Sequence, residues 1–538
     1  MEAYDYIVIG AGSAGCVLAN RLSADARTRV LLLEAGGRDR NPWIHIPVGY
    51  FKTMHNPATD WCMETEADPG LAGRSIKWPR GKVLGGSSSI NGLLYIRGQV
   101  EDYDHWRQLG NTGWSFEDVL PYFKKSENQE RGADDYHGVG GPLNVSDTRI
   151  RRPLCDSFIE ACTQVGIPAR DDFNGADQEG AGYFQLTARG GFRCSTARGY
   201  LKPVERRPNL TVQTHAHVER LLIEEGRAAG VAFSVKGAPR EARARGEVIL
   251  SAGAIGSPQI LQLSGIGPGA LLQRLGIELR HDLPGVGENL QDHLQIRAVL
   301  KTTRPMTLND EVHNPLRKMA MGIQFALFRS GPMTLAASLV AVFAKTRPEL
   351  ATPDVQYHMQ PLSADSPGEG LHRYSAFTAS VCQLRPESRG RIEIKSPDPA
   401  AHPAIHPNYL SARLDQEVAV ASLKLTRRIC AAPALAPLIA EELLPGPAVA
   451  SDEELLDSAR RISTTIYHPV GTCKMGADRS ADSLAVVDPR LRVHNIAGLR
   501  VVDASIMPTL VSGNTNAPTV MIAEKAADMI REDARAAS

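Results

Sequence analysis

The sequence lacks several features that would point to particular classes of protein. It has 60 lysine and arginine residues against 60 aspartate and glutamate residues, so there is no net charge to attract nucleic acid. Nor does any apolar run reach the roughly 18 residues that a membrane-spanning helix needs. We therefore expect neither a nucleic-acid-binding protein nor an integral membrane protein, and a small molecule is the expected partner.

The cysteines lack regular spacing. All eight are scattered and none forms a Cys-x-x-Cys pair, which disfavours both a disulfide framework and a zinc site. The chain also enters an apolar run at residues 6–9 almost at once, without the basic segment and cleavage site of a secretory signal. These absences predict a cytoplasmic protein without a bound metal.

One apolar stretch, at residues 319–328, is open to two interpretations. A buried helix is the commoner explanation for ten such residues, and we favour it. The alternative is an amphipathic surface helix, although such helices usually also carry a basic face. That alternative would add a peripheral contact with the inner face of the cytoplasmic membrane.

Several apolar runs are typical of β-strands, and helical patterns follow some of them. They lie at residues 6–9, 30–33, 210–213, 247–250 and 499–502. This α/β pattern predicts a mostly parallel sheet with helices packed on it, drawn from both ends of the chain. Residues from about 303 to 460 differ, because breaks such as Gly331-Pro332 separate irregular apolar segments, and we expect an inserted second domain there.

A glycine-rich turn follows the first predicted strand. Gly10 allows a tight turn, Gly12 lets the backbone approach a pyrophosphate, and Gly15 lets helix and strand pack closely. The second strand ends in Glu34, 19 residues beyond Gly15, where a carboxylate can bind ribose hydroxyls. We expect a dinucleotide to be bound by Gly10, Gly12, Ser13, Ala14, Gly15, Glu34 and Ala35. FAD and NAD share this motif, so it does not choose between them.

A second glycine-rich block, RGKVLGGSSSINGLLYIRG, occupies residues 80–98. It could be a surface loop, but the apolar residues at 83–84 and 92–96 indicate that it is buried. The amides of a buried loop need partners, and a flavin ring offers carbonyl and nitrogen acceptors. A nicotinamide-dependent dehydrogenase has no need of such a block.

With these blocks the sequence resembles the glucose-methanol-choline (GMC) oxidoreductases, and among them the bacterial choline-dehydrogenase-like alcohol dehydrogenases. One family signature is matched at residues 81–103, and a second, GAIGSPQILQLSGIGP, at residues 253–268. The further element DLPGVGENLQDH lies at residues 282–293. The C-terminal block contains Tyr467-His468-Pro469 and residues 513–516. The blocks follow in order across nearly the whole chain.

The resemblance implies a Rossmann-type FAD-binding domain with an inserted substrate-binding domain, itself an antiparallel sheet with helices. We expect the discontinuous FAD-binding domain at residues 1–155, 205–302 and 461–538. The substrate-binding domain is expected at residues 156–204 and 303–460.

The resemblance also implies which residues contact FAD. Val218 and Ala252 are expected near the adenine, and Asp503 with Ala504 near the ribityl chain or pyrophosphate, although an acid closing a strand could instead cap the next turn. The flavin ring and diphosphate are expected against Val83, Gly85, Gly86, Ser87, Asn91, Gly92, Leu93, Leu94, Tyr467, Thr515 and Pro518. Relatives that attach FAD covalently use a histidine where this chain has Ile90, so we expect non-covalent FAD.

Oxidation of an alcohol must remove a hydroxyl proton as well as the hydride that goes to flavin N5. Histidine is the usual base near neutral pH, and the resemblance makes His468 that base. Its partner is expected to be Asn516, whose amide would hold the substrate oxygen. His293 is the reserve base, for which a buried supporting position is favoured, and Asn514 is expected to cap the following helix.

The substrate is expected to be an uncharged primary alcohol, oxidised to its aldehyde. Choline would favour an aromatic cage, but all five tryptophans lie in the first 114 residues, although Trp61 and Tyr467 could contribute. By resemblance, a quinone or dye-type molecule is the expected electron acceptor. The alternatives are an oxygen-using alcohol oxidase, a choline dehydrogenase or a flavin-containing lyase.

Overall fold

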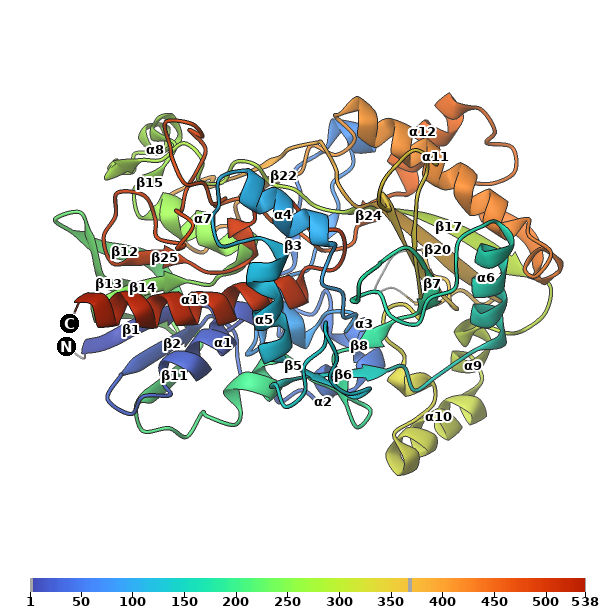
Figure 1. Ribbon diagram of the computed structural model, residues 1–538, viewed down its shortest axis with the longest axis horizontal. Coiled ribbons are helices and arrows are strands. Elements are labelled where there is room, and N and C mark those ends of the chain that lie inside the picture. The colour runs from blue at the N-terminus through green and yellow to red at the C-terminus, as the bar shows by residue number, and fades with distance from the viewer. Residues whose placement is uncertain (1–2, 366–369, 538) are drawn as a thin grey trace.

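The structure, a computed structural model, describes residues 3–365 and 370–537. Two seven-stranded sheets lie at opposite ends of its long axis, and both chain termini lie beside the first sheet (Figure 1). Over the described ranges, no helix is both long enough and apolar enough to cross a bilayer.

The first sheet has a parallel part and an antiparallel edge. Its order is β11-β2-β1-β14-β13-β12, and β25 pairs with β14. The parallel strands are β1 (Ala3–Ile9), β2 (Val30–Glu34), β11 (Leu210–Thr214), β14 (Ala238–Leu250) and β25 (Leu499–Val501). These are the five strands expected from the apolar runs, and the prediction is confirmed. The antiparallel edge consists of β12 (Ala216–Glu224) and β13 (Arg227–Val235).

Helices from the two ends of the chain pack together on this sheet. α1 (Ser13–Leu22) lies against α13 (Asn516–Ala537), which runs the length of the sheet in Figure 1. Arg21 of α1 forms an ion pair of 2.6 Å with the buried Glu524 of α13. α13 therefore packs with the first sheet, and it lies within residues 461–538, which we expect in the FAD-binding domain.

The second sheet is antiparallel, with the order β23-β17-β20-β19-β18-β7, and β24 pairs with β17. Helices α6 (Pro153–Gln164), α11 (Arg413–Cys430) and α12 (Asp452–Ile462) share its hydrophobic core. The strands are β7 (Gly180–Tyr183), β17 (Leu294–Thr302), β18 (Val340–Ala344), β19 (Val355–Gln360), β20 (Ala376–Gln383), β23 (Ile439–Leu444) and β24 (Thr464–Thr465). The inserted antiparallel domain is confirmed.

The expected domain boundaries differ from this topology at two strands. β17 and β24 belong to the second sheet, although residues 294–302 and 464–465 were assigned to the FAD-binding domain. On β17, Gln295 and Arg297 line a cavity, whereas Ile296, Ala298 and Leu300 pack in the core of the second domain. This alternation is typical of a strand, but it does not indicate which of the two sheets the strand joins.

The interpretation of residues 319–328 as a buried helix is wrong. They belong to α10 (Pro315–Phe328), which projects from the edge of the molecule (Figure 1). Only Phe325 of this helix is buried, and Leu316 and Leu327 are 71% and 68% exposed. Because helical periodicity shows the phase of an apolar face and not what covers it, the sequence alone could not decide this point.

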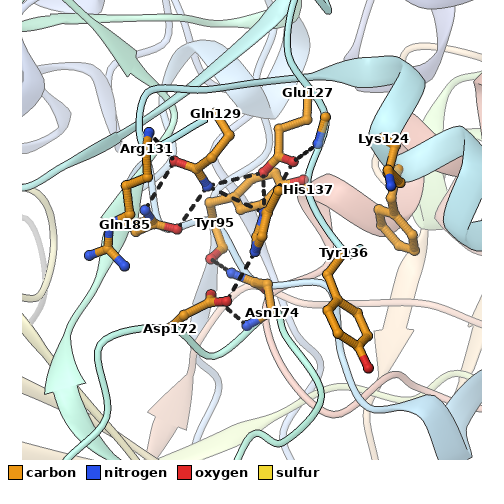
Figure 2. Close-up of polar contacts among 12 residues, drawn as sticks. Tyr95, Lys124, Glu127, Gln129, Arg131, Tyr136, His137, Asp172, Asn174 and Gln185 are labelled. Atoms are coloured by element: carbon orange, nitrogen blue, oxygen red, sulfur yellow. Dashed lines mark hydrogen bonds and ion pairs between the residues drawn. The ribbon is translucent and has the colours of Figure 1, made fainter. Parts of the chain in front are cut away.

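A buried polar cluster joins the two domains beside the 80–98 block. Figure 2 shows His137 between two carboxylates, with its Nδ1 atom 3.2 Å from Glu127 and its Nε2 atom 3.0 Å from Asp172. Although burial lowers it, the bonds to Asp172 and Glu127 raise the pKa of His137 to about 9. Arg97 adds a second cation 2.7 Å from Glu127, so two cations face two carboxylates. Through Arg97, the cluster links the end of the 80–98 block to Glu127 and to the Tyr136 carbonyl oxygen.

The remaining elements are the other helices and the strands outside the two seven-stranded sheets. The helices are α2 (Pro42–His45), α3 (Tyr50–Thr53), α4 (Val100–Gln108), α5 (Phe116–Ser126), α7 (Gly253–Leu263), α8 (Gly269–Arg274) and α9 (Leu308–Val312). The strands are β3 (Met63–Glu64), β4 (Lys77–Trp78), β5 (Glu127–Gln129), β6 (Leu143–Asp147), β8 (Gln185–Leu186), β9 (Ala188–Arg189), β10 (Phe192–Arg193), β15 (Ile266–Gly267), β16 (His281–Asp282), β21 (Arg391–Glu393) and β22 (Ala404–His406).

Candidate active site

One long cavity joins the two domains. It extends from the turn after β1, past the 80–98 block and the start of α7, to the polar faces of β17 and β19. His468 and its neighbours form another part of its wall. The cavity therefore brings together blocks that are hundreds of residues apart in the sequence.

The glycine turn at the first end of the cavity has the geometry that its spacing predicts. Gly10 has φ +95°, and a Cβ on Gly15 would lie 1.8 Å from the Gly10 carbonyl oxygen. Gly12 is different, since a Cβ there would meet only the Gly86 Cα at 3.9 Å. Gly10 and Gly15 thus make the close turn, and Gly12 leaves its backbone open to the cavity.

The start of α1 suits a phosphate group. No side chain caps this helix at Gly12, and Ser13 and Ala14 line the cavity. The first-turn amides and the helix dipole both favour an anion at this position.

Glu34 is held at the same end of the cavity by backbone amides. Its carboxylate accepts hydrogen bonds from Ala11 N–H at 2.9 Å and Gly36 N–H at 2.8 Å. Burial raises the pKa of Glu34 to about 7, although these two amides and Lys82 oppose that rise. A carboxylate has about four acceptor positions, so two remain for hydroxyl donors such as those of a ribose.

The 80–98 block packs directly on the glycine turn. Gly85 N–H donates to the Ala11 carbonyl oxygen at 2.7 Å, and Gly86 adopts φ +51°. A Cβ on Gly86 would lie only 2.7 Å from the Gly12 Cα. Two backbones therefore touch where any side chain would separate them.

Arg193 clamps the same block, and sequence reasoning missed it. Its buried guanidinium donates to Asn91 Oδ1 at 2.6 Å, Asn91 O at 2.7 Å and Ser88 O at 3.1 Å. Burial lowers the pKa of Arg193 to about 9. A lone arginine between Phe192 and Cys194 carries no sequence signal for this contact.

Most of the expected cofactor residues line the cavity. They are Gly10, Gly12, Ser13, Ala14, Glu34, Ala35, Gly86, Ser87, Asn91, Gly92, Leu93, Leu94, Val218, Ala252, Tyr467, Asp503, Ala504 and Thr515. The other four do not line it. Gly15 packs against the Gly10 carbonyl, and Val83 forms a β-bridge with Gly37. Gly85 donates a backbone hydrogen bond to Ala11, and Pro518 lies within α13.

Asp503 caps the turn that follows β25. Its carboxylate accepts bonds from Ser505 N–H at 2.8 Å, Gly253 N–H at 2.8 Å and Ser257 Oγ–H at 2.6 Å. The structure thus supports the capping alternative, and the residue joins the start of α7 to the C-terminal segment.

His468 lies between two polar partners. Its Nδ1 atom is 3.0 Å from His293 Nδ1, and its Nε2 atom is 3.1 Å from Asn514 Nδ2. His293 Nε2 is 2.9 Å from the Leu384 carbonyl oxygen, which can only accept, so that nitrogen carries the proton. A neutral His293 then accepts at Nδ1 from His468 Nδ1–H. This order leaves the basic lone pair of His468 on Nε2.

Burial lowers the pKa of His468 well below its usual value, and the nearby His293, His358 and Arg80 lower it further. Burial also lowers the pKa of His293 to about 4. Both imidazoles are therefore neutral near pH 7, which is the form that a base requires.

The backbone that carries His468 is strained and firmly held. Tyr467 has φ +71°, a left-handed conformation that a tyrosine seldom adopts. Its N–H donates to Thr465 Oγ1 at 2.7 Å, and its carbonyl accepts from Arg80 at 2.7 Å. His468 N–H donates to the buried Asp292 at 2.7 Å. A strained backbone that several hydrogen bonds hold in place is typical of functional sites.

The expected pairing of His468 with Asn516 is corrected to Asn514. Asn516 lines the same cavity, but its Oδ1 accepts from Ser13 Oγ–H at 2.9 Å. Asn514 Oδ1 accepts from Gln356 Nε2 at 3.2 Å, so the amide nitrogen of Asn514 is directed at His468. Asn514 precedes α13, whereas Asn516 is its first residue, and the helix turns the second amide away.

The second sheet contributes further polar groups near His468. Gln356 and His358 lie two residues apart on β19 and share one face. Their Oε1 and Nε2 atoms, with Ser380 Oγ on the neighbouring strand, are buried and have no hydrogen-bond partner among the described residues. Because His358 lines the cavity, this face can receive polar groups of a bound molecule.

A dinucleotide-binding turn that shares one cavity with a neutral, rigidly held histidine defines a dinucleotide-dependent oxidoreductase. Comparisons with known proteins extend this conclusion. The GMC oxidoreductase models match residues 4–295 and 386–523. The chain belongs to the GMC oxidoreductase family.

Relatives at the level of whole chains agree. An alcohol dehydrogenase [acceptor] of Pseudomonas putida is 45% identical over 98% of this chain and 95% of its own. The mitochondrial choline dehydrogenase of Homo sapiens is 45% identical over 98% of this chain and 90% of its own. A solved structure of an Aspergillus oryzae formate oxidase, studied for FAD modification, superposes with a TM-score of 0.91 at 26% identity over 99% of each chain. The protein is an FAD-dependent oxidoreductase that acts on CH–OH donors.

Proposed function

We propose that this enzyme oxidises an uncharged primary alcohol to its aldehyde, with His468 as the base, and passes the electrons to a quinone or dye-type acceptor. The observation that carries the proposal is the neutral His468, whose basic Nε2 atom lies beside the Asn514 amide. The name of the Pseudomonas putida relative supports an acceptor-linked dehydrogenase.

The described residues fit FAD. The open backbone at Gly12, the uncapped start of α1 and the spare acceptor positions of Glu34 suit the diphosphate and ribose. The block from Gly86 to Leu94 continues the wall toward His468. We propose that these residues hold FAD, with Tyr467 and Thr515 beside the flavin. When bound, FAD supplies the hydride acceptor.

The chain itself supplies the proton acceptor. A substrate hydroxyl that enters between Asn514 Nδ2 and His468 Nε2 would displace the 3.1 Å hydrogen bond between them, accept a hydrogen bond from the amide and donate its proton to His468 Nε2. The hydroxyl proton then resides on His468 while the carbon loses a hydride, and the alcohol becomes an aldehyde. Asp292 and Arg80 keep the His468 backbone in place during this step.

Charge near the site supports an uncharged substrate over choline. Of the described residues that line the cavity, only Glu34 and Asp503 are acidic, and both are bound to backbone amides at the nucleotide end. Arg80 and Arg297 line the cavity near Tyr467 and would repel a quaternary ammonium. The Trp61 ring already has Lys82 Nζ 4.4 Å from its centroid. An aromatic cage for choline is therefore poorly supported.

Replacing His468 tests the proposal. The His468→Ala enzyme should keep FAD but reduce it at least ~10²-fold more slowly when an alcohol is added without oxygen. Unchanged anaerobic bleaching would remove His468 from the mechanism. Absence of bleaching in the unaltered enzyme with any alcohol would favour the lyase alternative. Flavin reoxidation under air and by an artificial quinone, compared side by side, separates an oxidase from a dehydrogenase.

We further propose that FAD is held without a covalent bond at residue 90. Ile90 lines the cavity and is 3% exposed, and its side chain has no nucleophilic atom. Acid precipitation should release intact FAD into the supernatant. Yellow colour that stays with the precipitate would contradict non-covalent attachment. We also propose a cytoplasmic location.

A further inference from the structure

The outward face of α10 is apolar, which is the reverse of an ordinary surface helix. Leu316, Met319, Ile323 and Leu327 follow the three- and four-residue spacing of one face. They are 71%, 59%, 51% and 68% exposed. The opposite side carries Phe325, which is buried against the molecule with the edge of its ring toward Phe192. Phe325 thus anchors the helix while the larger apolar surface faces outward.

The charges of α10 have one sign. Arg317 and Lys318 are exposed, neither forms an ion pair with a described residue, and the helix contains no acidic residue. On a helical projection Arg317 lies beside the apolar face, whereas Lys318 lies on the side of Phe325, about 20° from it. Lysine and arginine beside an exposed apolar face are typical of helices that lie in the headgroup region of anionic membranes.

The size of the face disfavours a second copy of the chain as its partner. A helix of 14 residues is about 21 Å long and about 10 Å wide, so its footprint is about 200 Å². A stable protein interface buries about 800 Å² on each partner. A lipid surface needs no such area and offers the opposite charge.

We propose that α10 docks the enzyme on an anionic lipid bilayer, with its apolar face among the acyl chains and Arg317, at the border of that face, at the headgroups. This surface goes beyond the alcohol oxidation proposed above and does not depend on it. The helix is also close to the cavity in sequence: η5 (Pro332–Thr334) follows it, and Ala337 and Ser338 then line the cavity wall. Ala337 N–H donates to the Gly92 carbonyl at 3.3 Å. Docking through α10 would therefore bring this wall near a lipid-soluble acceptor.

The test uses the FAD-loaded enzyme and co-sedimentation with vesicles of phosphatidylcholine, with and without phosphatidylglycerol. The unaltered enzyme should bind the anionic vesicles, and Met319→Gln/Ile323→Gln/Leu327→Gln should lower the partition coefficient at least ~10-fold. Leu109→Gln/Val139→Gln, at exposed apolar positions elsewhere, is the matched control and should bind normally. Arg317→Glu/Lys318→Glu should remove the preference for phosphatidylglycerol and the weakening by salt.

Two further measurements keep the outcome clear. Oxidation of alcohol with a water-soluble dye should be unchanged in every α10 variant, so a failure of docking is distinguishable from a failure of the proposed reaction. Equal vesicle binding by the triple variant, or no binding by the unaltered enzyme, would overturn the proposal. So would sedimentation as a dimer that the triple variant converts to a monomer, because a second copy would then cover α10.

Discussion

The Nδ1 atoms of His293 and His468 lie 3.0 Å apart, with the two rings nearly perpendicular at 84°. Since the Leu384 carbonyl fixes the proton of His293 on Nε2, His293 must accept a hydrogen bond from His468. His293 therefore determines which nitrogen of His468 is basic, although it does not itself line the cavity.

Replacing His293 should separate this positioning effect from simple packing. His293→Leu removes the acceptor, and the loss of one such hydrogen bond should slow flavin reduction about 10-fold. His293→Gln keeps an acceptor oxygen and should restore much of the rate. Stopped-flow reduction with alcohol, without oxygen, measures both. Equal rates for the leucine and glutamine variants would show that the tautomer is not set in this way.

The two asparagines near His468 should differ sharply in importance. Asn514→Ala removes the donor beside His468 Nε2 and should lower the rate of flavin reduction about 10- to 100-fold. Asn516→Ala removes a bond to Ser13 at the start of α1 and should mainly weaken FAD retention. The flavin-to-protein absorbance ratio and the reduction rate, measured on both variants, check this. A larger rate loss in Asn516→Ala would restore the pairing first expected from the sequence.

The pH dependence of flavin reduction should reflect the neutral state of His468. The base is active when deprotonated, so the rate rises with pH through its pKa and then levels off. Burial and the neighbouring His293, His358 and Arg80 place that pKa well below 6.5. We expect a rate that is constant from pH 6.5 upward and falls only in acid. A midpoint near pH 7.5 in the anaerobic reduction rate would contradict the neutral His468.

Gly86→Ala should release FAD. Its Cβ would lie 2.7 Å from the Gly12 Cα, and φ +51° adds strain, so the 80–98 block must move away from the glycine turn. The purified variant should contain several-fold less flavin for each protein chain. Gly73→Ala is the control, because Gly73 has φ +77° but no atom within 4 Å of the added Cβ. Equal flavin loss in both variants would point to backbone strain alone.

Strands and the glycine turn could be predicted from the sequence because their signals are local. β2 is buried throughout and therefore forms an unbroken apolar run, and Gly10 and Gly15 each meet a local steric need. The family resemblance then added the blocks around Ile90 and His468.

The remaining parts of the site depend on contacts that no local pattern records. Gln295 and Arg297 of β17 alternate with apolar residues that pack in the second core, so the pattern predicts a strand but not the sheet that it joins. Asn514 and Asn516 are chemically identical, and only the start of α13 decides which amide meets His468. Arg193 and Gln356 act across long sequence separations, so their contacts appear only in the folded chain.

The position of β25 and α13 has a consequence for synthesis. β25 pairs with β14, and α13 packs on α1, so the first sheet holds its earliest and latest segments side by side. During translation β1 and the glycine turn leave the ribosome hundreds of residues before the strand and helix that complete their layer. His468 and Asn514 emerge almost as late. The ribosome must therefore release β25 and the start of α13 before the cofactor pocket can close, and flavin loading must wait for these segments.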